Sequence, residues 1–159
     1  MDVNFKKINK MNFFQKLYNK VYLLYLKLLG AKIENSVRIY GKIKIIGDPN
    51  KLIIKNHSTI NFGVLFNCRD IIEIGKNVRI SPYAQFHTGA LNLDPNNRIH
   101  YNKKIIVKDN VWICSGAIVN PGIVIEKNSV LLPGSVLNIN MEENSVYGGV
   151  PAKFIKKVC

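Results

Sequence analysis

The chain has 159 residues, a length that suits one domain with a core of its own. Its formal net charge of +13 predicts an anionic partner, such as a phosphate-bearing cofactor or an acidic lipid surface. Nucleic acid is disfavoured as that partner, because the sequence has no zinc-finger spacing, RNP-like aromatic motif or recognition-helix pattern. Three irregularly spaced cysteines do not form a disulfide framework or metal cluster, and no secretory signal is visible. Together these features predict a cytoplasmic protein with reduced thiols.

Residues 1–32 are a separate N-terminal amphipathic segment. Within it, residues 11–29 predict a helix that ends before Gly30. The longest stretch without charge, residues 21–26, is far too short to span a bilayer, which needs about 20 apolar residues. Apolar side chains share one helix face and lysines lie opposite them: Phe14, Leu17, Val21, Leu24 and Leu28 against Lys16, Lys20 and Lys27.

Two placements of this helix follow from its pattern. It covers the end of the main body or packs on a neighbouring subunit, which is the favoured interpretation. Alternatively, residues 1–30 make a peripheral contact with the inner face of the membrane, where Lys6, Lys7 and Lys10 add attraction to acidic lipids.

From residue 33 onward the sequence repeats every six residues, a period that neither a helix nor an ordinary strand has. A bulky apolar residue, here called an anchor, marks each repeat: Ile33, Ile39, Ile45, Ile54, Ile60, Phe66, Ile74, Ile80, Phe86, Val107, Ile113, Val119, Ile125, Leu131 and Leu137. A mostly small or aliphatic residue follows four positions after each anchor.

The gaps between anchors indicate how the chain winds. Within each group of three anchors the step is always six, and between groups the extra residues number three, two, fifteen and zero. Interruptions therefore fall only once in eighteen residues. This pattern predicts a repeat protein of about five triangular coils, with three short parallel strands per coil, inward-pointing anchors and insertions at one corner. The coils span residues 33–141, with a loop insertion at 92–106, and residues 142–159 form a C-terminal strand or helix tail.

The later repeats carry a more specific pattern. The run "VKDNVWICSGAIVNPGIVIEKNSVLLPGSV", followed by "VYGGVPAKFIKK", resembles the hexapeptide-repeat acyltransferases, in the branch that acetylates sugars and surface polysaccharides. The resemblance covers about residues 33–157. It implies an all-β fold, a left-handed parallel β-helix with an N-terminal α-helix and a short C-terminal helix. It also implies a homotrimer, with acetyl-CoA as acyl donor and the 92–106 loop beside the acceptor site between subunits.

Acetyl transfer to a sugar hydroxyl needs a base, because the hydroxyl is a poor nucleophile at neutral pH. His87 follows the anchor Phe86 and should point outward, in a column with Asn67 and Asn120 that could hydrogen-bond its ring. His100 lies inside the loop. The resemblance places the working histidine where this chain has Leu91. Neither histidine is at that position. His87 is preferred over His100 as the base. The third interpretation is that His87 is only a polar residue of its column and that the catalysis of this protein is altered.

The resemblance also implies the donor site, in the fourth and fifth coils. Small residues there suit a pantetheine arm lying against the backbone, and lysines of the C-terminal tail suit the phosphates of CoA. The predicted cofactor-binding residues are Trp112, Ser115, Gly116, Ala117, Gly134, Ser135, Lys153 and Lys156; the predicted substrate-binding residues are Asn67, Asp94 and Asn120. Asp94, before Pro95, is equally explained as a turn former.

Three other functions remain open at this stage. N-acetylation of an amino sugar needs the same base and is not separated from O-acetylation. A zinc enzyme of the carbonic anhydrase type needs three converging histidines, whereas His57, His87 and His100 are predicted on different faces, so no metal is expected. A non-catalytic β-helix scaffold is favoured by the missing family histidine and disfavoured by the intact donor run.

Overall fold

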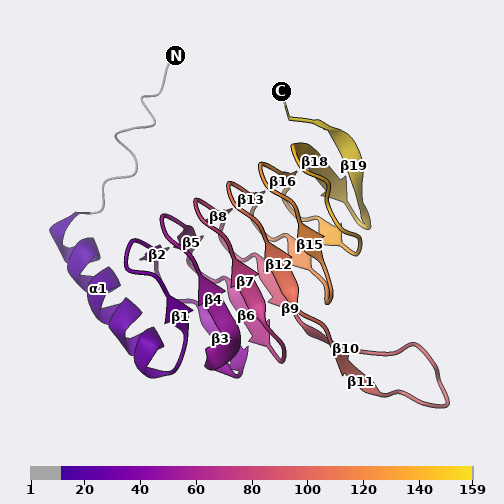
Figure 1. The fold of residues 1–159 in the computed structure, drawn as a ribbon, viewed down its shortest axis with the longest axis horizontal. Helices are drawn as coiled ribbons and strands as arrows, with labels where there is room; N and C mark the ends of the chain where they lie inside the picture. The colour runs from indigo at the N-terminus through magenta and orange to yellow at the C-terminus, as the bar shows by residue number, and fades with distance from the viewer. Residues whose placement is uncertain (1–11, 159) are drawn as a thin grey trace.

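The computed structural model describes residues 12–158. The predicted basic flank of Lys6, Lys7 and Lys10 lies outside the described residues, as does Cys159. Figure 1 shows a helix at one end, a stack of coils that advances along one axis, an arm that leaves the stack, and a two-stranded cap at the other end.

Three parallel sheets form the sides of the stack. Sheet I contains β1 (Lys32–Ile33), β4 (Leu52–Ile54), β7 (Ile72–Ile74), β12 (Ile105–Val107) and β15 (Val124–Ile125). Sheet II contains β2 (Arg38–Tyr40), β5 (Thr59–Asn61), β8 (Arg79–Ile80), β13 (Trp112–Ile113), β16 (Val130–Leu131), β18 (Ser145–Gly149) and β19 (Ala152–Lys157). Sheet III contains β3 (Lys44–Gly47), β6 (Leu65–Cys68), β9 (Gln85–His87), β14 (Ile118–Val119) and β17 (Val136–Leu137). A 3-10 turn, η1 (Pro49–Lys51), lies in the corner between β3 and β4.

The strand register confirms the coil count predicted from the repeat. In sheet III the paired anchors are Ile45 with Phe66, Phe66 with Phe86, Phe86 with Val119, and Val119 with Leu137. Each pair is separated by one turn of eighteen residues plus the predicted insertion. Because each strand within the coils pairs with a strand of the next coil and not with its neighbour along the chain, the chain is a parallel β-solenoid of about five turns.

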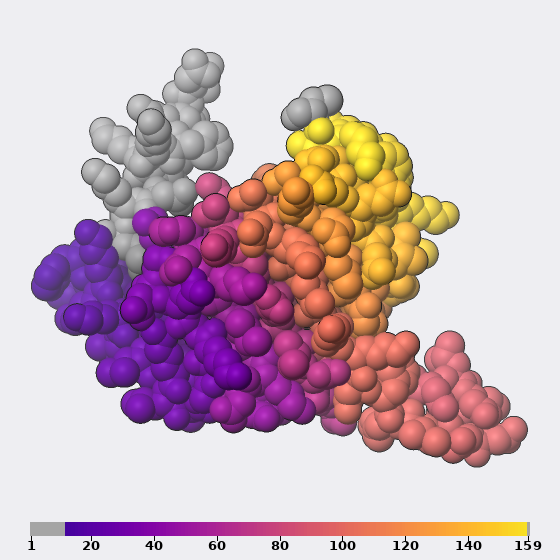
Figure 2. Space-filling view, in the orientation of Figure 1, coloured from indigo at the N-terminus to yellow at the C-terminus, as the bar shows by residue number. Residues whose placement is uncertain are grey.

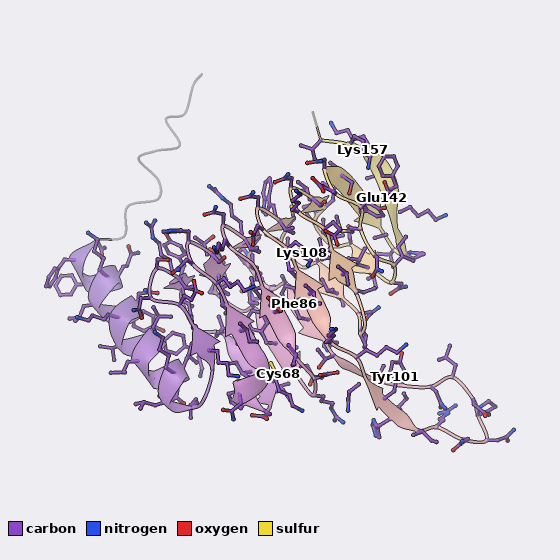
Figure 3. The ribbon with its side chains drawn as sticks, viewed as in Figure 1. Cys68, Phe86, Tyr101, Lys108, Glu142 and Lys157 are labelled. Carbon is purple, nitrogen blue, oxygen red and sulfur yellow. The ribbon has the colours of Figure 1, made fainter. Side chains whose placement is uncertain are left out.

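The anchors form the core. Fourteen of the fifteen are buried, and Ile45, in the first coil, is half-buried. Phe66 and Phe86 are fully buried and their rings stack, with centroids 5.2 Å apart and planes 16° from parallel. Figure 3 shows Phe86 inside the stack of coils. Anchors of successive coils therefore fill the interior as continuous columns, which is how a solenoid buries apolar surface.

Helix α1 (Phe13–Leu28) closes the first coil. A capping box starts it, since the Asn12 side chain accepts from the Gln15 backbone and the Gln15 side chain accepts from the Asn12 backbone. Leu23 and Leu26 are buried against the solenoid. Asn19 accepts a hydrogen bond from the Ile39 N–H at 2.6 Å and donates one to the Val37 carbonyl at 3.2 Å. The helix thus satisfies backbone groups along the open edge of β2.

The helix face that contacts the solenoid differs from the predicted apolar face. Phe14, Leu17, Val21, Leu24 and Leu28 are all more than half exposed. The reason is that the open edge of β2 needs polar partners, so the side of the helix that carries Asn19 and the Tyr22 hydroxyl turns inward. In residues 12–158 no helix is both long and apolar enough to cross a membrane.

The predicted short C-terminal helix is wrong. The described C-terminal residues form the antiparallel hairpin of β18 and β19, in which Gly148 pairs with Lys153. β18 pairs in parallel with β16, and rings of Tyr147 and Phe154 meet edge to face at 5.8 Å. The last coil of sheet II would otherwise present an unpaired edge, and the backbone of β18 satisfies that edge by pairing with β16.

The long insertion is a β-hairpin, here called the arm, made of β10 (Gly89–Leu91) and β11 (His100–Asn102). Figures 1 and 2 show that it projects away from the solenoid. The chain leaves the coil at Gly89, before the predicted start of the insertion at residue 92. The repeat predicts how many residues are inserted. The start of the arm is at Gly89 because backbone pairing between β10 and β11 begins there.

Candidate active site

His87 stands at the end of β9, half-buried and pointing out of the core. Its Nε2 lies 3.0 Å from Oε1 of Gln85, two residues earlier on the same outward side of the strand. With the amide oxygen as acceptor, Nε2 carries the proton and Nδ1 keeps a lone pair. Burial lowers the pKa of His87, because desolvation disfavours the charged imidazolium. The ring is therefore neutral at neutral pH, as a general base requires.

The two asparagines of the predicted column behave differently. Asn67 pairs in register with His87 on the neighbouring strand β6, and its Oδ1 is buried without a hydrogen-bond partner among the described residues. Asn120, on the other side, donates to the side chain of Asn138. Neither is bonded to the imidazole. The orienting partner is Gln85, which sequence reasoning missed although the two-residue period of a strand places it beside His87.

His100 is exposed on β11, and the structure pairs it directly across the arm from Leu91. Side chains of directly opposed residues in an antiparallel pair lie about 4.5–5.5 Å apart at Cβ. His100 thus lies next to the position where the family resemblance implies a histidine. Asp94 is exposed at the arm tip, and its Oδ1 accepts from the Asn96 backbone at 2.9 Å, as in a turn.

His57 occupies a corner of the second coil, exposed and with a positive φ of 63°. The three histidines thus lie on separate elements: a corner, strand β9 and the arm. In residues 12–158 the structure brings together no group of three side chains able to hold a metal ion. Burial raises the pKa of the Cys68 thiol to about 12, so this thiol stays protonated and is a poor nucleophile.

An exposed strip runs along the corner between sheets II and III in coils four and five. Ser115 and Gly134 are exposed, and Gly116 is half-buried. Gly116 and Gly134 have positive φ values of 67° and 64°, and no atom lies within 4 Å of the position where a Cβ would stand. The strip is therefore open along its length and can hold a thin, extended chain against the backbone.

Ala117 and Ser135, which were also predicted to bind the cofactor, point into the core and not toward the strip. The side chains of Ala117 and Ser135 are fully buried, and the Ser135 hydroxyl accepts a hydrogen bond from the Gly149 N–H at 3.1 Å. They occupy the small, inward position of their repeats, so only their backbone faces the strip. Lys153 and Lys156 are exposed on β19, and neither forms an ion pair within the described part of the chain, whereas Lys157 pairs with Glu142 at 2.7 Å.

A groove of about 850 Å³ lies over the outer face of sheet II, from β2 to β13; we name it the β2–β13 groove. Arg38, Thr59, Arg79 and Trp112 follow one another in register across its floor. Trp112, predicted at the donor site, is about half exposed and donates from Nε1 to the Ser81 hydroxyl at 3.0 Å. Sequence reasoning did not find this groove, because the repeat gives the column of residues on its floor but not how the side chains around that column pack.

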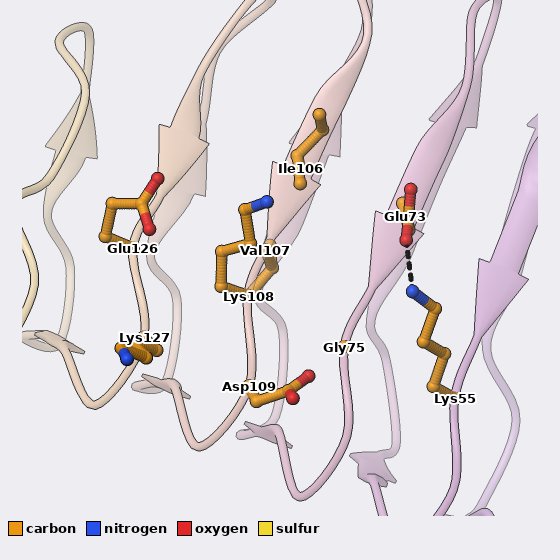
Figure 4. Close-up of a pocket in the computed structure, with 9 residues that line it drawn as sticks. All are labelled: Lys55, Glu73, Gly75, Ile106, Val107, Lys108, Asp109, Glu126 and Lys127. Atoms are coloured by element: carbon orange, nitrogen blue, oxygen red, sulfur yellow. Dashed lines mark hydrogen bonds and ion pairs between the residues drawn. The ribbon is translucent and has the colours of Figure 1, made fainter.

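A smaller depression of about 360 Å³ lies on sheet I (Figure 4). Charges of both signs line it, and Lys55 pairs with Glu73 at 2.5 Å across neighbouring strands. This arrangement is that of a solvated surface with cross-strand ion pairs. It offers no unpaired cluster of one sign to a ligand.

Similarity to known proteins shows the family to which the chain belongs. No family model matches the sequence. WbbJ of Escherichia coli K12, named as a lipopolysaccharide biosynthesis O-acetyl transferase, is 35% identical over 160 aligned residues that cover 74% of this chain and 81% of that protein. The chain belongs to the hexapeptide-repeat acetyltransferase family.

Other hexapeptide-repeat acetyltransferases agree with this placement. The structure of VCA0836 from Vibrio cholerae, a hexapeptide-repeat-containing acetyltransferase, superposes with a TM-score of 0.77 at 27% identity, covering 87% of this chain and 79% of that one. The predicted left-handed parallel β-helix is thereby confirmed. The galactoside O-acetyltransferase of Escherichia coli K12 is 33% identical over 64% of this chain. The chain spans only about half the length of several curated relatives, 54% in that case.

Proposed function

We propose that the protein transfers an acetyl group from acetyl-CoA to a hydroxyl of a sugar in a surface polysaccharide or its precursor, with His87 as general base. The observation that carries the proposal is the His87 site itself. A neutral imidazole, oriented by Gln85, stands beside the unpartnered buried oxygen of Asn67. After a small movement of the Asn67 side chain, a sugar hydroxyl can donate to this oxygen while a neighbouring hydroxyl meets the imidazole. Similarity to WbbJ supports a polysaccharide acceptor.

The chemistry follows from these groups. Nδ1 of His87 accepts the hydroxyl proton as the sugar oxygen forms its bond to the acetyl carbonyl carbon. Acetyl-CoA supplies the acetyl group as a thioester, whose thiolate is the leaving group. His87 then returns the proton to that sulfur, so the base is restored. Backbone N–H groups near the strip could hold the developing oxyanion.

Acetyl-CoA fits the open strip on the corner of coils four and five. Ser115, Gly116 and Gly134 leave room for a pantetheine arm. Lys153 and Lys156 have no ion pair within residues 12–158 and can meet phosphates. Solved structures of related folds, such as VCA0836, have been determined with acetyl-CoA bound. These features support acetyl-CoA as the donor.

Acetyl-CoA is expected to raise the midpoint of thermal unfolding, because a ligand that binds only the folded state stabilises it by about 2.7 kcal/mol at a hundred times its Kd. Differential scanning fluorimetry with acetyl-CoA, and with dephospho-CoA as the matched control, measures the shift. The replacement of Lys153 and Lys156 by glutamine should reduce it. An unchanged midpoint at saturating acetyl-CoA would favour the non-catalytic scaffold.

We also propose a homotrimer, in which the arm and the exposed face of α1 contact neighbouring subunits. Leu93 on the arm is 95% exposed and Leu28 on α1 is 79% exposed, and both are apolar side chains that association would bury. Multi-angle light scattering should give three times the 18.0 kDa chain mass. A monomer that floats with acidic vesicles would instead assign the α1 face to the membrane surface.

A further inference from the structure

The β2–β13 groove is marked by its charge. Arg38 on β2 and Arg79 on β8 are both exposed, and β5 separates their strands. The spacing between neighbouring strands, about 4.8 Å, places their Cα atoms about 10 Å apart on the same face. Both guanidinium groups can therefore reach one small ligand between them.

Positive charge in the groove is not compensated. No aspartate or glutamate of residues 12–158 lines it. Within residues 12–158 neither Arg38 nor Arg79 forms an ion pair. The depression on sheet I differs, because there the cation of Lys55 is paired across the strands. Guanidinium groups bind phosphate through two parallel hydrogen bonds, so two unpaired arginines facing one groove favour a phosphate or diphosphate.

The groove also holds an unmet hydrogen-bonding group. The hydroxyl of Tyr40, a residue that lines the groove next to Arg38, is buried without a hydrogen-bond partner among the described residues. Buried hydroxyl groups are rarely left unpaired, since desolvation without a partner is unfavourable. A polar ligand in the groove could supply a partner after a small movement of the ring.

An aromatic pair forms the rim. Phe62 lines the groove and meets Tyr83 edge to face, with centroids 5.1 Å apart; both rings are about half exposed. Tyr83 has a positive φ of 61°, in a corner where the coils on either side have Gly63 and Gly116. A tyrosine in this conformation is strained, and strain of this kind concentrates at functional sites. An exposed aromatic ring beside cations suits a sugar or base attached to a phosphate.

From these contacts we infer that the β2–β13 groove binds a sugar joined to a phosphate or diphosphate, with Arg38 and Arg79 on the phosphate and the Phe62–Tyr83 pair against the attached ring. The inference does not depend on the proposed function, because the groove lies on sheet II whereas His87 is on β9 of sheet III. A nucleotide-linked sugar and a lipid-diphosphate-linked sugar share the recognised chemistry.

Isothermal titration calorimetry in the absence of acetyl-CoA tests the inference. Pyrophosphate is the minimal probe, UDP-N-acetylglucosamine and farnesyl diphosphate represent the two sources, and N-acetylglucosamine is the neutral control. Pyrophosphate is expected to bind, and Arg38→Gln and Arg79→Gln each to weaken it at least tenfold. Lys108→Gln removes one charge from the other face of the molecule and should change nothing. Tighter binding of one diphosphate ester than of pyrophosphate identifies the source.

Tyr83→Gly separates recognition from folding, because glycine relieves the positive φ. The variant should keep or raise the unfolding midpoint and should lose the preference for the diphosphate ester over pyrophosphate. The inference is overturned if pyrophosphate fails to bind at millimolar concentration, if N-acetylglucosamine binds equally well, or if Lys108→Gln weakens binding as much as Arg79→Gln. Since no acetyl-CoA is present, these outcomes do not depend on acetyl transfer.

Discussion

Replacement of His87 by alanine is expected to lower kcat for acetyl transfer about 100- to 10 000-fold, the range over which a general base contributes. The physical reason is that His87 is the one described histidine that is half-buried and held by a neighbouring side chain, Gln85, and that burial lowers its pKa. Affinity for acetyl-CoA should change little, because the donor strip is on the corner between sheets II and III in coils four and five, whereas His87 is on β9 in coil three. Steady-state kinetics with acetyl-CoA and a sugar acceptor, together with the thermal shift by acetyl-CoA, separates the two effects.

The other histidines supply the comparison. His57→Asn should leave kcat unchanged, because His57 occupies a corner with positive φ, a conformation that asparagine accepts. His100→Ala tests the position opposite Leu91. Full activity in His87→Ala with loss of activity in His100→Ala would transfer the role of base from the solenoid to the arm.

The pH dependence of kcat/KM is a second test of His87 as the general base. Since desolvation lowers the pKa of His87, its neutral form persists below the usual histidine pKa of about 6.5. The base is active when neutral, so kcat/KM should be level at pH 7 and fall as the pH drops through this lowered pKa. An acid limb that remained in the residual activity of His87→Ala would contradict the assignment.

Replacement of Phe66 by alanine is expected to lower the free energy of unfolding by about 3–5 kcal/mol, the usual cost of emptying a buried aromatic site. Phe66 is fully buried in the second coil and stacks on Phe86 in the third. A solenoid coil contacts only its neighbours, so the cavity cannot be filled from elsewhere. Chemical denaturation followed by circular dichroism measures the change.

The matched control is Phe14→Ala on the exposed face of α1, where the same substitution should change stability by no more than about 0.5 kcal/mol in the isolated chain. Phe66→Leu keeps most of the volume and should lose less than half as much stability as Phe66→Ala. Equal losses in Phe66→Ala and Phe14→Ala would mean that the stacked column does not hold the coils together.

The periodicity of the sequence was enough to predict the solenoid. A six-residue repeat fixes which side chains point inward, and the insertions fix how many residues each coil contains. Register in all three sheets agrees with both predictions, because parallel pairing of successive coils allows only one phase for buried anchors. The outward position of His87 followed from the same phase, since it comes one residue after the anchor Phe86.

Other features depended on which backbone edges and surfaces the fold leaves open. The open edge of β2 turned Asn19 of α1 inward and left Phe14 exposed, although hydropathy alone predicts the reverse. In the same way the edge of the last coil selected a hairpin in place of a helix. Backbone groups that lack a strand partner must find another, and the sequence of a helix does not state where those groups lie.

For the ligand-binding surfaces as well, the sequence determines some features and only the tertiary structure shows the others. Sequence alone determined that His87 points outward, because this follows from its position within one repeat. Arg38, Arg79 and Trp112 each precede an anchor, so the repeat puts them in one column. Only the tertiary structure showed that a groove lies over them, since its depth depends on how side chains of four coils pack. The repeat determines which way each side chain points within one coil. A binding surface forms only where coils stack on one another. The charge of that surface is set by outward-facing residues, whose identity the repeat does not constrain.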